Sequence, residues 1–172
     1  MDLENPAIKN GVYAGLAACG ILLLFYLVKD RMVFTWASWV STIIFIYFMV
    51  MSVRSEKAAL EHMSFNDALK PAFLTFVVSN LLYITFYYVL LNFIAPDLVE
   101  MQRKIAMETM EKMGNLMGED AMEEGIEALE NHDFSFGLKT AALSFAWGLI
   151  FPGFIVSAII ALVMKDRKPE AS

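Results

Sequence analysis

The stretch Pro71–Ala95 reads PAFLTFVVSNLLYITFYYVLLNFIA, 25 residues without a formal charge. As an α-helix it rises roughly 37 Å, whereas the hydrocarbon core of a bilayer is about 30 Å thick. Lys70 precedes the stretch, and the longest polar segment of the chain follows it. The stretch therefore predicts a membrane-spanning helix that leads into a large extramembrane loop.

Three further apolar stretches are long enough to span a bilayer: 11–28, 32–53 and 136–164. Lys139, near the start of the last one, is the only charged residue in the four stretches. The chain is 58% hydrophobic, and its apolar residues come in long blocks, as expected for a membrane protein. The predicted fold is all-α: an integral membrane four-helix bundle, one membrane domain over 1–172, with a helical hairpin between spans three and four.

The polar loop 96–135 is acidic and amphipathic. Residues 96–138 have a net charge of −8, whereas the rest of the chain has +2, which argues against binding to nucleic acid. Apolar and charged residues recur at helical spacing from Pro96 to Gly118 and again after Asp120. The loop is therefore expected to form a helical hairpin that lies on the outer face of the bundle, with Asp120 as the cap of its second helix.

Local signals predict where two spans begin and where one bends. Ser64 with Asp67 three residues on has the form of a helix N-cap, so a helix is expected to start there and lead into the third span. Asp133 or Ser135 is the expected cap of the last helix. Pro152 lies near the middle of that helix and is expected to bend it.

The positive charges beside the spans predict the orientation. With the N-terminus inside, seven Lys and Arg residues lie on the inner side and six on the outer side. Basic residues favour the cytoplasmic side, so both termini are expected in the cytoplasm and the acidic loop outside. In this topology His62 and His132 lie on opposite sides of the membrane and cannot share a metal ion.

The sequence contains no recognisable catalytic constellation. It has no Ser/His/Asp grouping and no glycine-rich phosphate loop, and its spans hold no acidic residue of the kind used in proton relays. We therefore expect a protein that is not an enzyme and has no cofactor and no metal site. The methionines at 107, 110, 113 and 117 suit Cu(I), but they lie beside the apolar face of an amphipathic helix, which favours packing.

Two groups of residues within the spans are candidates for function. Ser79, Asn80 and Tyr83 form a polar group near the middle of the third span, for interhelical hydrogen bonds or for a substrate. Small residues and a proline predict close helix packing at Gly11, Gly15, Gly148, Pro152 and Gly153. Packing within one chain is the favoured interpretation, and homo-oligomerisation remains open.

The loop supplies the candidates for contact with a partner. They are the methionines and acidic residues Met110, Met113, Met117, Glu123 and Glu127. A structured amphipathic loop in a chain without reactive groups is typical of a protein that binds other proteins.

Three segments resemble a known family: Glu4–Gly11 (ENPAIKNG), Ser64–Lys70 (SFNDALK) and the last span with its basic tail. The family comprises small integral membrane proteins, common in Bacteroidetes and catalogued as a domain of unknown function. The resemblance implies four spans, an inner-membrane location and a long helical loop between spans three and four. It also implies relatives encoded near membrane-associated glycosyltransferases and envelope genes, and it implies no catalytic residue.

These features favour a non-enzymatic accessory or scaffold subunit for a bacterial envelope protein, such as a glycosyltransferase. The alternative is a small carrier or flippase-like protein for a lipid-linked or apolar solute. In that alternative Ser79, Asn80 and the bent last helix would line one cavity.

Overall fold

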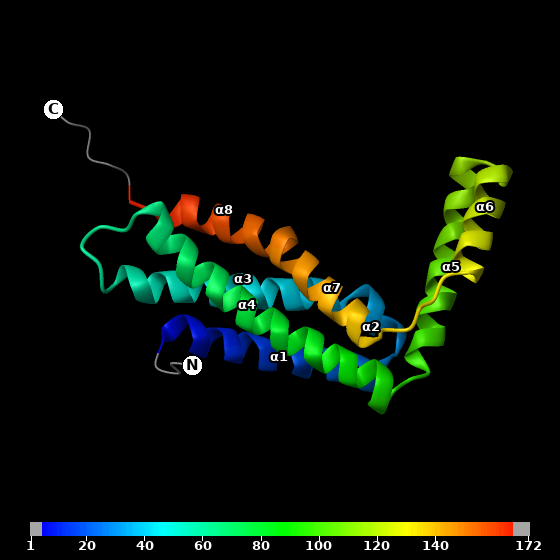
Figure 1. Cartoon of the computed structure of the whole chain (residues 1–172), viewed down its shortest axis with the longest axis horizontal. Helices are drawn as coiled ribbons and strands as arrows, with labels where there is room; N and C mark the ends of the chain where they lie inside the picture. The colour runs from blue at the N-terminus through cyan, green and yellow to red at the C-terminus, as the bar shows by residue number, and fades with distance from the viewer. Residues whose placement is uncertain (1–4, 167–172) are drawn as a thin grey trace.

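The computed structural model describes residues 5–166, except for the side chains of residues 114–117 and 119–121. Four long helical segments form a bundle, and a hairpin of two helices leaves one end of it (Figure 1). The four segments are long and apolar enough to cross a membrane: Pro6–Val28, Ala37–Lys57, Phe65–Ile94 and Leu138–Met164. They confirm the predicted all-α membrane bundle with a hairpin between spans three and four.

The first span starts before its apolar stretch because the sequence provides a helix N-terminus there. α1 (Pro6–Val28) has Asn5 as its N-cap, and Asn5 Oδ1 accepts a hydrogen bond from Ala7 N at 2.9 Å. Pro6 occupies the first turn, where its fixed φ suits a helix and its missing N–H costs nothing. The helix therefore begins five residues before the predicted span.

The second span is interrupted near its start. α2 (Arg31–Thr35) and α3 (Ala37–Lys57) are separated by Trp36, whose φ of −116° departs from a regular helix. The sequence predicted one continuous helix over 32–53. The difference has a physical reason, since the short α2 places the buried side chain of Val33 in an apolar cluster with Leu98 of the hairpin base.

The third span starts at the predicted capping box. Before α4 (Phe65–Val89), Ser64 Oγ accepts a hydrogen bond from Asp67 N, and an Asp67 carboxylate oxygen accepts one from Ser64 N. The helix ends in a π-helical turn, η1 (Leu90–Ile94). The start at Phe65 adds six residues to the apolar stretch that begins at Pro71.

The fourth span is bent at Pro152, as predicted. It consists of α7 (Leu138–Gly148), a π-helical segment η2 (Leu149–Phe154) and α8 (Ile155–Met164). Within η2, Phe151 has φ −135° and ψ 117°, which is an extended conformation. Pro152 has no N–H to give to a helical hydrogen bond, so a departure from the helix beside it is expected.

The predicted cap of the fourth span is wrong. Gly137 takes the N-cap position and makes no side-chain hydrogen bond there. Asp133 instead closes a local turn, where its carboxylate accepts hydrogen bonds from Ser135 N and Ser135 Oγ at 2.9 Å each. These hydrogen bonds occupy the Asp133 carboxylate and the Ser135 hydroxyl before the helix begins, so neither side chain is available as its N-cap.

The loop folds into the predicted hairpin, made of α5 (Leu98–Met117) and α6 (Glu119–Glu130). Gly118 joins them with φ +95°, a conformation that suits glycine. Gly118 also takes the N-cap position of α6, so the prediction that Asp120 caps this helix is wrong. The hairpin runs across the direction of the spans and extends toward the side formed by α7 and α8 (Figure 1).

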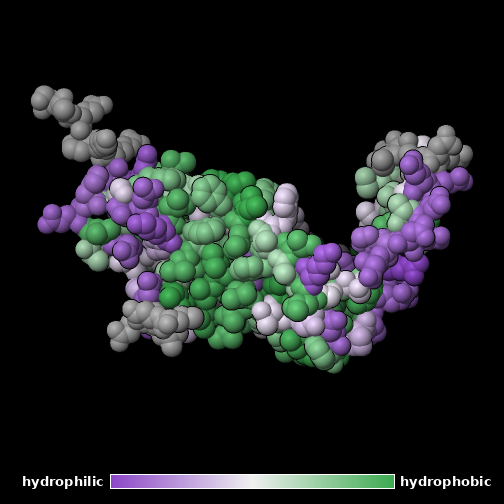
Figure 2. Space-filling view, viewed as in Figure 1, coloured by the Kyte–Doolittle hydropathy of each residue, from purple (hydrophilic) through white to green (hydrophobic). Residues whose placement is uncertain are grey.

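An apolar band covers the middle of the bundle on the face seen in Figure 2, and hydrophilic residues border it at both ends. Large apolar side chains are more than half exposed across this band, among them Ile43, Tyr47, Leu143, Trp147 and Val163. Contiguous apolar surface of this extent is costly in water and indicates contact with lipid. The chain therefore has the surface of a multi-pass membrane protein.

Candidate functional site

A buried polar group ties three spans together near the end where α1 begins. Thr75 Oγ1 of α4 lies 2.6 Å from Ser52 Oγ of α3 and 3.1 Å from the carbonyl oxygen of Ala7 in α1. Ser52 Oγ also accepts a hydrogen bond from Asn10 Nδ2 at 3.0 Å. Thr75 and Ser52 are almost fully buried, so the group serves interhelical hydrogen bonding.

The glycines of α1 lie against α4 of the same chain. A Cβ at Gly11 would lie 2.7 Å from Val78 Cβ and 2.9 Å from the carbonyl oxygen of Thr75. A Cβ at Gly15 would lie 2.8 Å from Leu82 Cβ. Both positions are therefore filled by intrachain packing, which brings the two helix backbones close together.

Ser79 and Asn80 are packed between α4 and the bent fourth span. Ser79 has no exposed surface, and its hydroxyl donates to the carbonyl oxygen of Phe76 at 3.0 Å. Asn80 is 7% exposed, and a Cβ at Gly148 would lie 3.0 Å from its Nδ2 atom. Gly153, beside Pro152, admits the Phe76 ring in the same way. The cavity that the carrier hypothesis requires at Ser79 and Asn80 is thus occupied by protein atoms.

Two buried side-chain polar atoms of the spans have no hydrogen-bond partner within the described part of the chain. They are Asn80 Nδ2 and Ser41 Oγ, which face the bundle interior from α4 and α3. Buried polar groups are nearly always paired, because an unpaired one costs about 1–3 kcal/mol. Burying these two atoms without a partner therefore costs free energy of this order.

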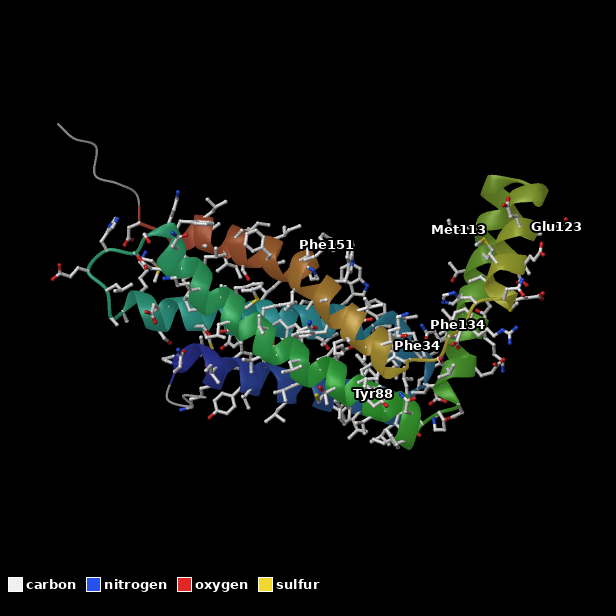
Figure 3. All side chains as sticks on the ribbon, in the orientation of Figure 1. Phe34, Tyr88, Met113, Glu123, Phe134 and Phe151 are labelled. Carbon is white, nitrogen blue, oxygen red and sulfur yellow. The ribbon has the colours of Figure 1, made fainter. Side chains whose placement is uncertain are left out.

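A cavity of about 470 Å³ lies where the bundle meets the hairpin. Its walls come from α2, α3, α4, α5, α7 and the segment between α6 and α7, and include Phe34, Ser38, Tyr83, Tyr87, Phe136 and Ser144. Figure 3 shows Phe34 and Phe134 at this junction. The sequence predicted one polar site made of Ser79, Asn80 and Tyr83. Tyr83 lines this cavity, whereas Ser79 and Asn80 are buried outside it.

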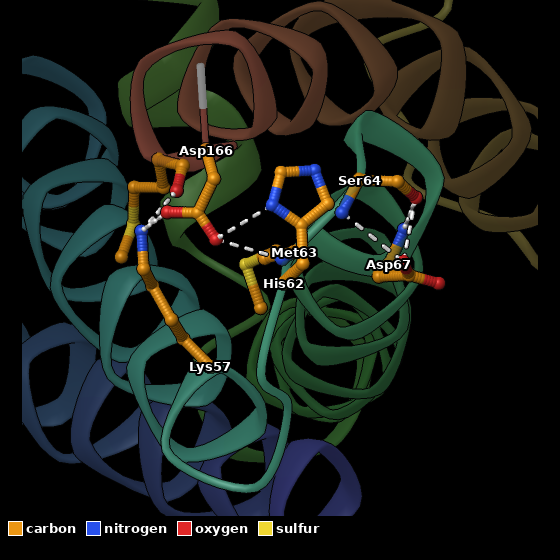
Figure 4. A network of polar contacts seen from close by, with 7 residues as sticks. Lys57, His62, Met63, Ser64, Asp67 and Asp166 are labelled. Carbon is orange, nitrogen blue, oxygen red and sulfur yellow. Dashed lines mark hydrogen bonds and ion pairs between the residues drawn. The ribbon is translucent and has the colours of Figure 1, made fainter. Parts of the chain in front are cut away.

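At the opposite end, a carboxylate fastens the end of α8 to the connector between α3 and α4 (Figure 4). Asp166 accepts a hydrogen bond from Lys57 Nζ at 2.6 Å and another from Met63 N at 2.7 Å. The backbone N–H of Asp166 donates in turn to the carbonyl oxygen of Met63 at 2.9 Å. These contacts lower the pKa of the Asp166 carboxyl, first through Lys57 and then through the backbone N–H of Met63.

This carboxylate predicts a loss of stability in acid. Its pKa in the folded protein is below the ordinary value of about 3.9, so the stabilisation is present above that value and disappears as the pH falls through the lowered pKa. Asp166→Asn should therefore lower the melting temperature in detergent at pH 7, and the difference from the wild type should shrink toward pH 3. A difference that does not change with pH would contradict this assignment.

The candidate partner residues divide into two groups. Met113, Glu123 and Glu127 are exposed on the hairpin, and Figure 3 shows the first two away from the bundle. Met110 packs inside the hairpin, because its Sδ lies 2.7 Å from where a Cβ would stand at Gly125. The side chain of Met117 falls outside the described residues.

An ion pair fixes the base of the hairpin. Arg31 Nη2 of α2 donates to Glu108 Oε2 of α5 at 2.6 Å, and this hydrogen bond lowers the pKa of Glu108. Leu98, at the start of α5, is buried in one apolar cluster with Val33 of α2, so the hairpin is anchored to the bundle through its first helix. Glu123, Glu124, Glu127 and Glu130 of α6 are exposed, and Figure 3 shows Glu123 away from the bundle.

Sequence reasoning missed the cavity and the Asp166 contacts. Both depend on residues far apart in the chain: Ser38, Tyr83 and Ser144 in one case, Lys57 and Asp166 in the other. One signal was available, because Asp166 is an isolated acid in the basic segment that follows the last span.

The family model described as "Protein of unknown function (DUF4199)" matches residues 9–166. We found no match among curated proteins or solved structures. The match runs from Lys9 in the first span to Asp166 after the last one and includes the hairpin.

Proposed function

The chain belongs to the DUF4199 family of proteins of unknown function, and we propose that it is a non-enzymatic accessory or scaffold subunit that binds a neighbouring membrane protein of the bacterial envelope. The observation that carries the proposal is the direction of the hairpin, whose first helix crosses the end of the bundle and then extends sideways beyond it (Figure 1). An element that reaches beyond its own bundle is placed to contact a neighbour in the membrane.

The charge of the hairpin supports a protein as that neighbour. Glu123, Glu124, Glu127 and Glu130 are all exposed on α6. Anionic lipid headgroups would repel this surface, whereas a basic extramembrane surface of another protein would attract it. The neighbour is therefore expected to carry Lys and Arg on the same side of the membrane.

The fourth span supplies a second surface on the side toward which the hairpin extends. Leu143, Trp147 and Ile150 are each more than 60% exposed. A partner's spanning helix could pack on this apolar face while its extramembrane part meets the hairpin. A membrane glycosyltransferase is one partner of this kind.

The location proposed for the complex is the inner membrane, with both termini in the cytoplasm. The seven-to-six distribution of Lys and Arg supports this orientation, since the start of α1 and the end of α8 lie at the end opposite the hairpin (Figure 1). The hairpin would then face the periplasm.

The test is photocrosslinking in native membranes from the exposed positions 124 and 130, followed by charge reversal at 123 and 127. The labelled hairpin should give one heteromeric adduct, and Glu123→Lys/Glu127→Lys should reduce complex formation at least tenfold. Glu56→Lys/Glu61→Lys makes the same charge change at exposed positions near the opposite end and should leave the adduct intact. Adducts only with lipid or with a second copy of this chain would refute the proposal.

A further inference from the structure

We propose that the cavity between the bundle and the hairpin binds an uncharged amphiphile whose head is a planar ring bearing carbonyl oxygens, that is, a lipid of the quinone class. The volume of about 470 Å³ falls within the range of roughly 300–1,000 Å³ typical of ligand pockets. This site is separate from the hairpin surface that carries the proposed scaffold role.

The lining of the cavity selects for a neutral head. Every described residue that lines it is apolar, aromatic, hydroxyl-bearing or an amide, so no carboxylate, ammonium or guanidinium group faces the interior. A charged headgroup would lose its hydration without gaining a counterion, which is costly. A phospholipid head is therefore a poor occupant.

The polar groups of the cavity favour a ligand with hydrogen-bond acceptors. Four hydroxyl-bearing residues line it from three helices: Ser38, Tyr83, Tyr87 and Ser144. Hydroxyl groups can donate or accept, whereas a carbonyl oxygen can only accept, so the pairing requires donation from the protein. A head with two carbonyl oxygens would match donors on opposite walls.

Aromatic walls favour a flat ring over an acyclic head. Five of the residues that line the cavity are aromatic: Phe34, Tyr83, Tyr87, Phe134 and Phe136. A planar ring can pack on such a wall with offset or edge-to-face contacts.

The surroundings of the cavity provide a route for an apolar tail. Leu143 and Trp147 are more than 60% exposed beside Ser144, so the α7 wall borders the lipid-facing surface. Trp36 and Trp39 are exposed at the same end of the bundle, where indole rings mark the membrane–water interface. A ligand with its ring at this level and its tail in the lipid would satisfy both surroundings.

The test uses purified full-length protein in phosphatidylcholine nanodiscs with decylubiquinone as the probe, followed by quenching of tryptophan fluorescence. Quenching should saturate, and Ser144→Phe, which fills the cavity, should weaken binding at least tenfold. Leu143→Phe adds an aromatic ring one residue away on the lipid-facing surface and should bind as the wild type does. If Ser144→Phe fails to fold, Ala106→Phe fills the same cavity from α5.

Two further measurements address the head of the ligand. Removing the hydroxyl groups with Ser38→Ala/Tyr83→Phe should weaken binding roughly fivefold or more, as expected for lost hydrogen bonds. Monoolein, a neutral amphiphile with an acyclic head, should not displace decylubiquinone at tenfold excess. Quenching that does not saturate, that is equal in all variants, or that monoolein abolishes would overturn the proposal.

Discussion

The double substitution Gly11→Ala/Gly15→Ala is expected to lower the free energy of unfolding by about 2–6 kcal/mol, from about 1–3 kcal/mol at each overpacked position. Each added methyl group would collide with Cβ atoms of α4, and at Gly11 also with a backbone oxygen that cannot rotate away. The two helices would have to separate along their shared face. The midpoint of unfolding by sodium dodecyl sulfate in mixed micelles measures the effect.

Gly20→Ala is the matched control for this prediction. Gly20 lies on the same helix, and an added Cβ would meet no atom within 4 Å. Its substitution should leave the unfolding midpoint close to that of the wild type. Equal midpoints for all variants, or a change in oligomeric mass instead of stability, would show that the two glycines contact another chain.

Thr75→Val is expected to cost about 1–2 kcal/mol of stability. The substitution keeps the shape of the side chain but removes the hydroxyl that lies between α1, α3 and α4. The value should exceed the average of about 0.6 kcal/mol for one interhelical hydrogen bond in a membrane protein, because the lost hydroxyl is buried within hydrogen-bond distance of both Ser52 Oγ and the Ala7 carbonyl oxygen.

Thr85→Val on the same helix is the control that separates the loss of contacts between spans from the loss of a hydrogen bond within α4. Thr85 is exposed, and its hydroxyl donates to the carbonyl oxygen of Leu81 at 2.7 Å, whereas Thr75 Oγ1 lies 2.8 Å from the carbonyl oxygen of Pro71, the equivalent position on the helix. Its substitution should change stability by less than about 0.5 kcal/mol. If both variants behave alike, the contacts between the three spans contribute little.

Local sequence signals predicted much of the fold. The uncharged stretches identified four spans because lipid excludes charge, and Ser64 with Asp67 marked the start of α4 because a capping box involves residues three apart. Gly118 ended α5 for a similarly local reason. These features need no knowledge of how distant segments meet.

The remaining features depend on distant segments. Trp36 interrupts the second span in favour of contacts between Val33 and the hairpin base, which hydropathy does not reveal. The sequence pattern made Asp133 a reasonable N-cap, but its carboxylate accepts a hydrogen bond from Ser135 N in a local turn and does not cap the helix. Tyr83 lies in the cavity only because α3 and α7 both pack on α4 near it.

The sideways course of the hairpin limits which neighbours this protein can engage. α5 lies against its own bundle as far as Glu108, which pairs with Arg31, so the part that extends beyond the bundle is residues 109–117, roughly 14 Å along the helix axis. An arm of that length can overhang one adjacent bundle, and a second ring of proteins would be out of its reach. Complexes built around this arm would therefore contain immediate neighbours in the plane of the bilayer.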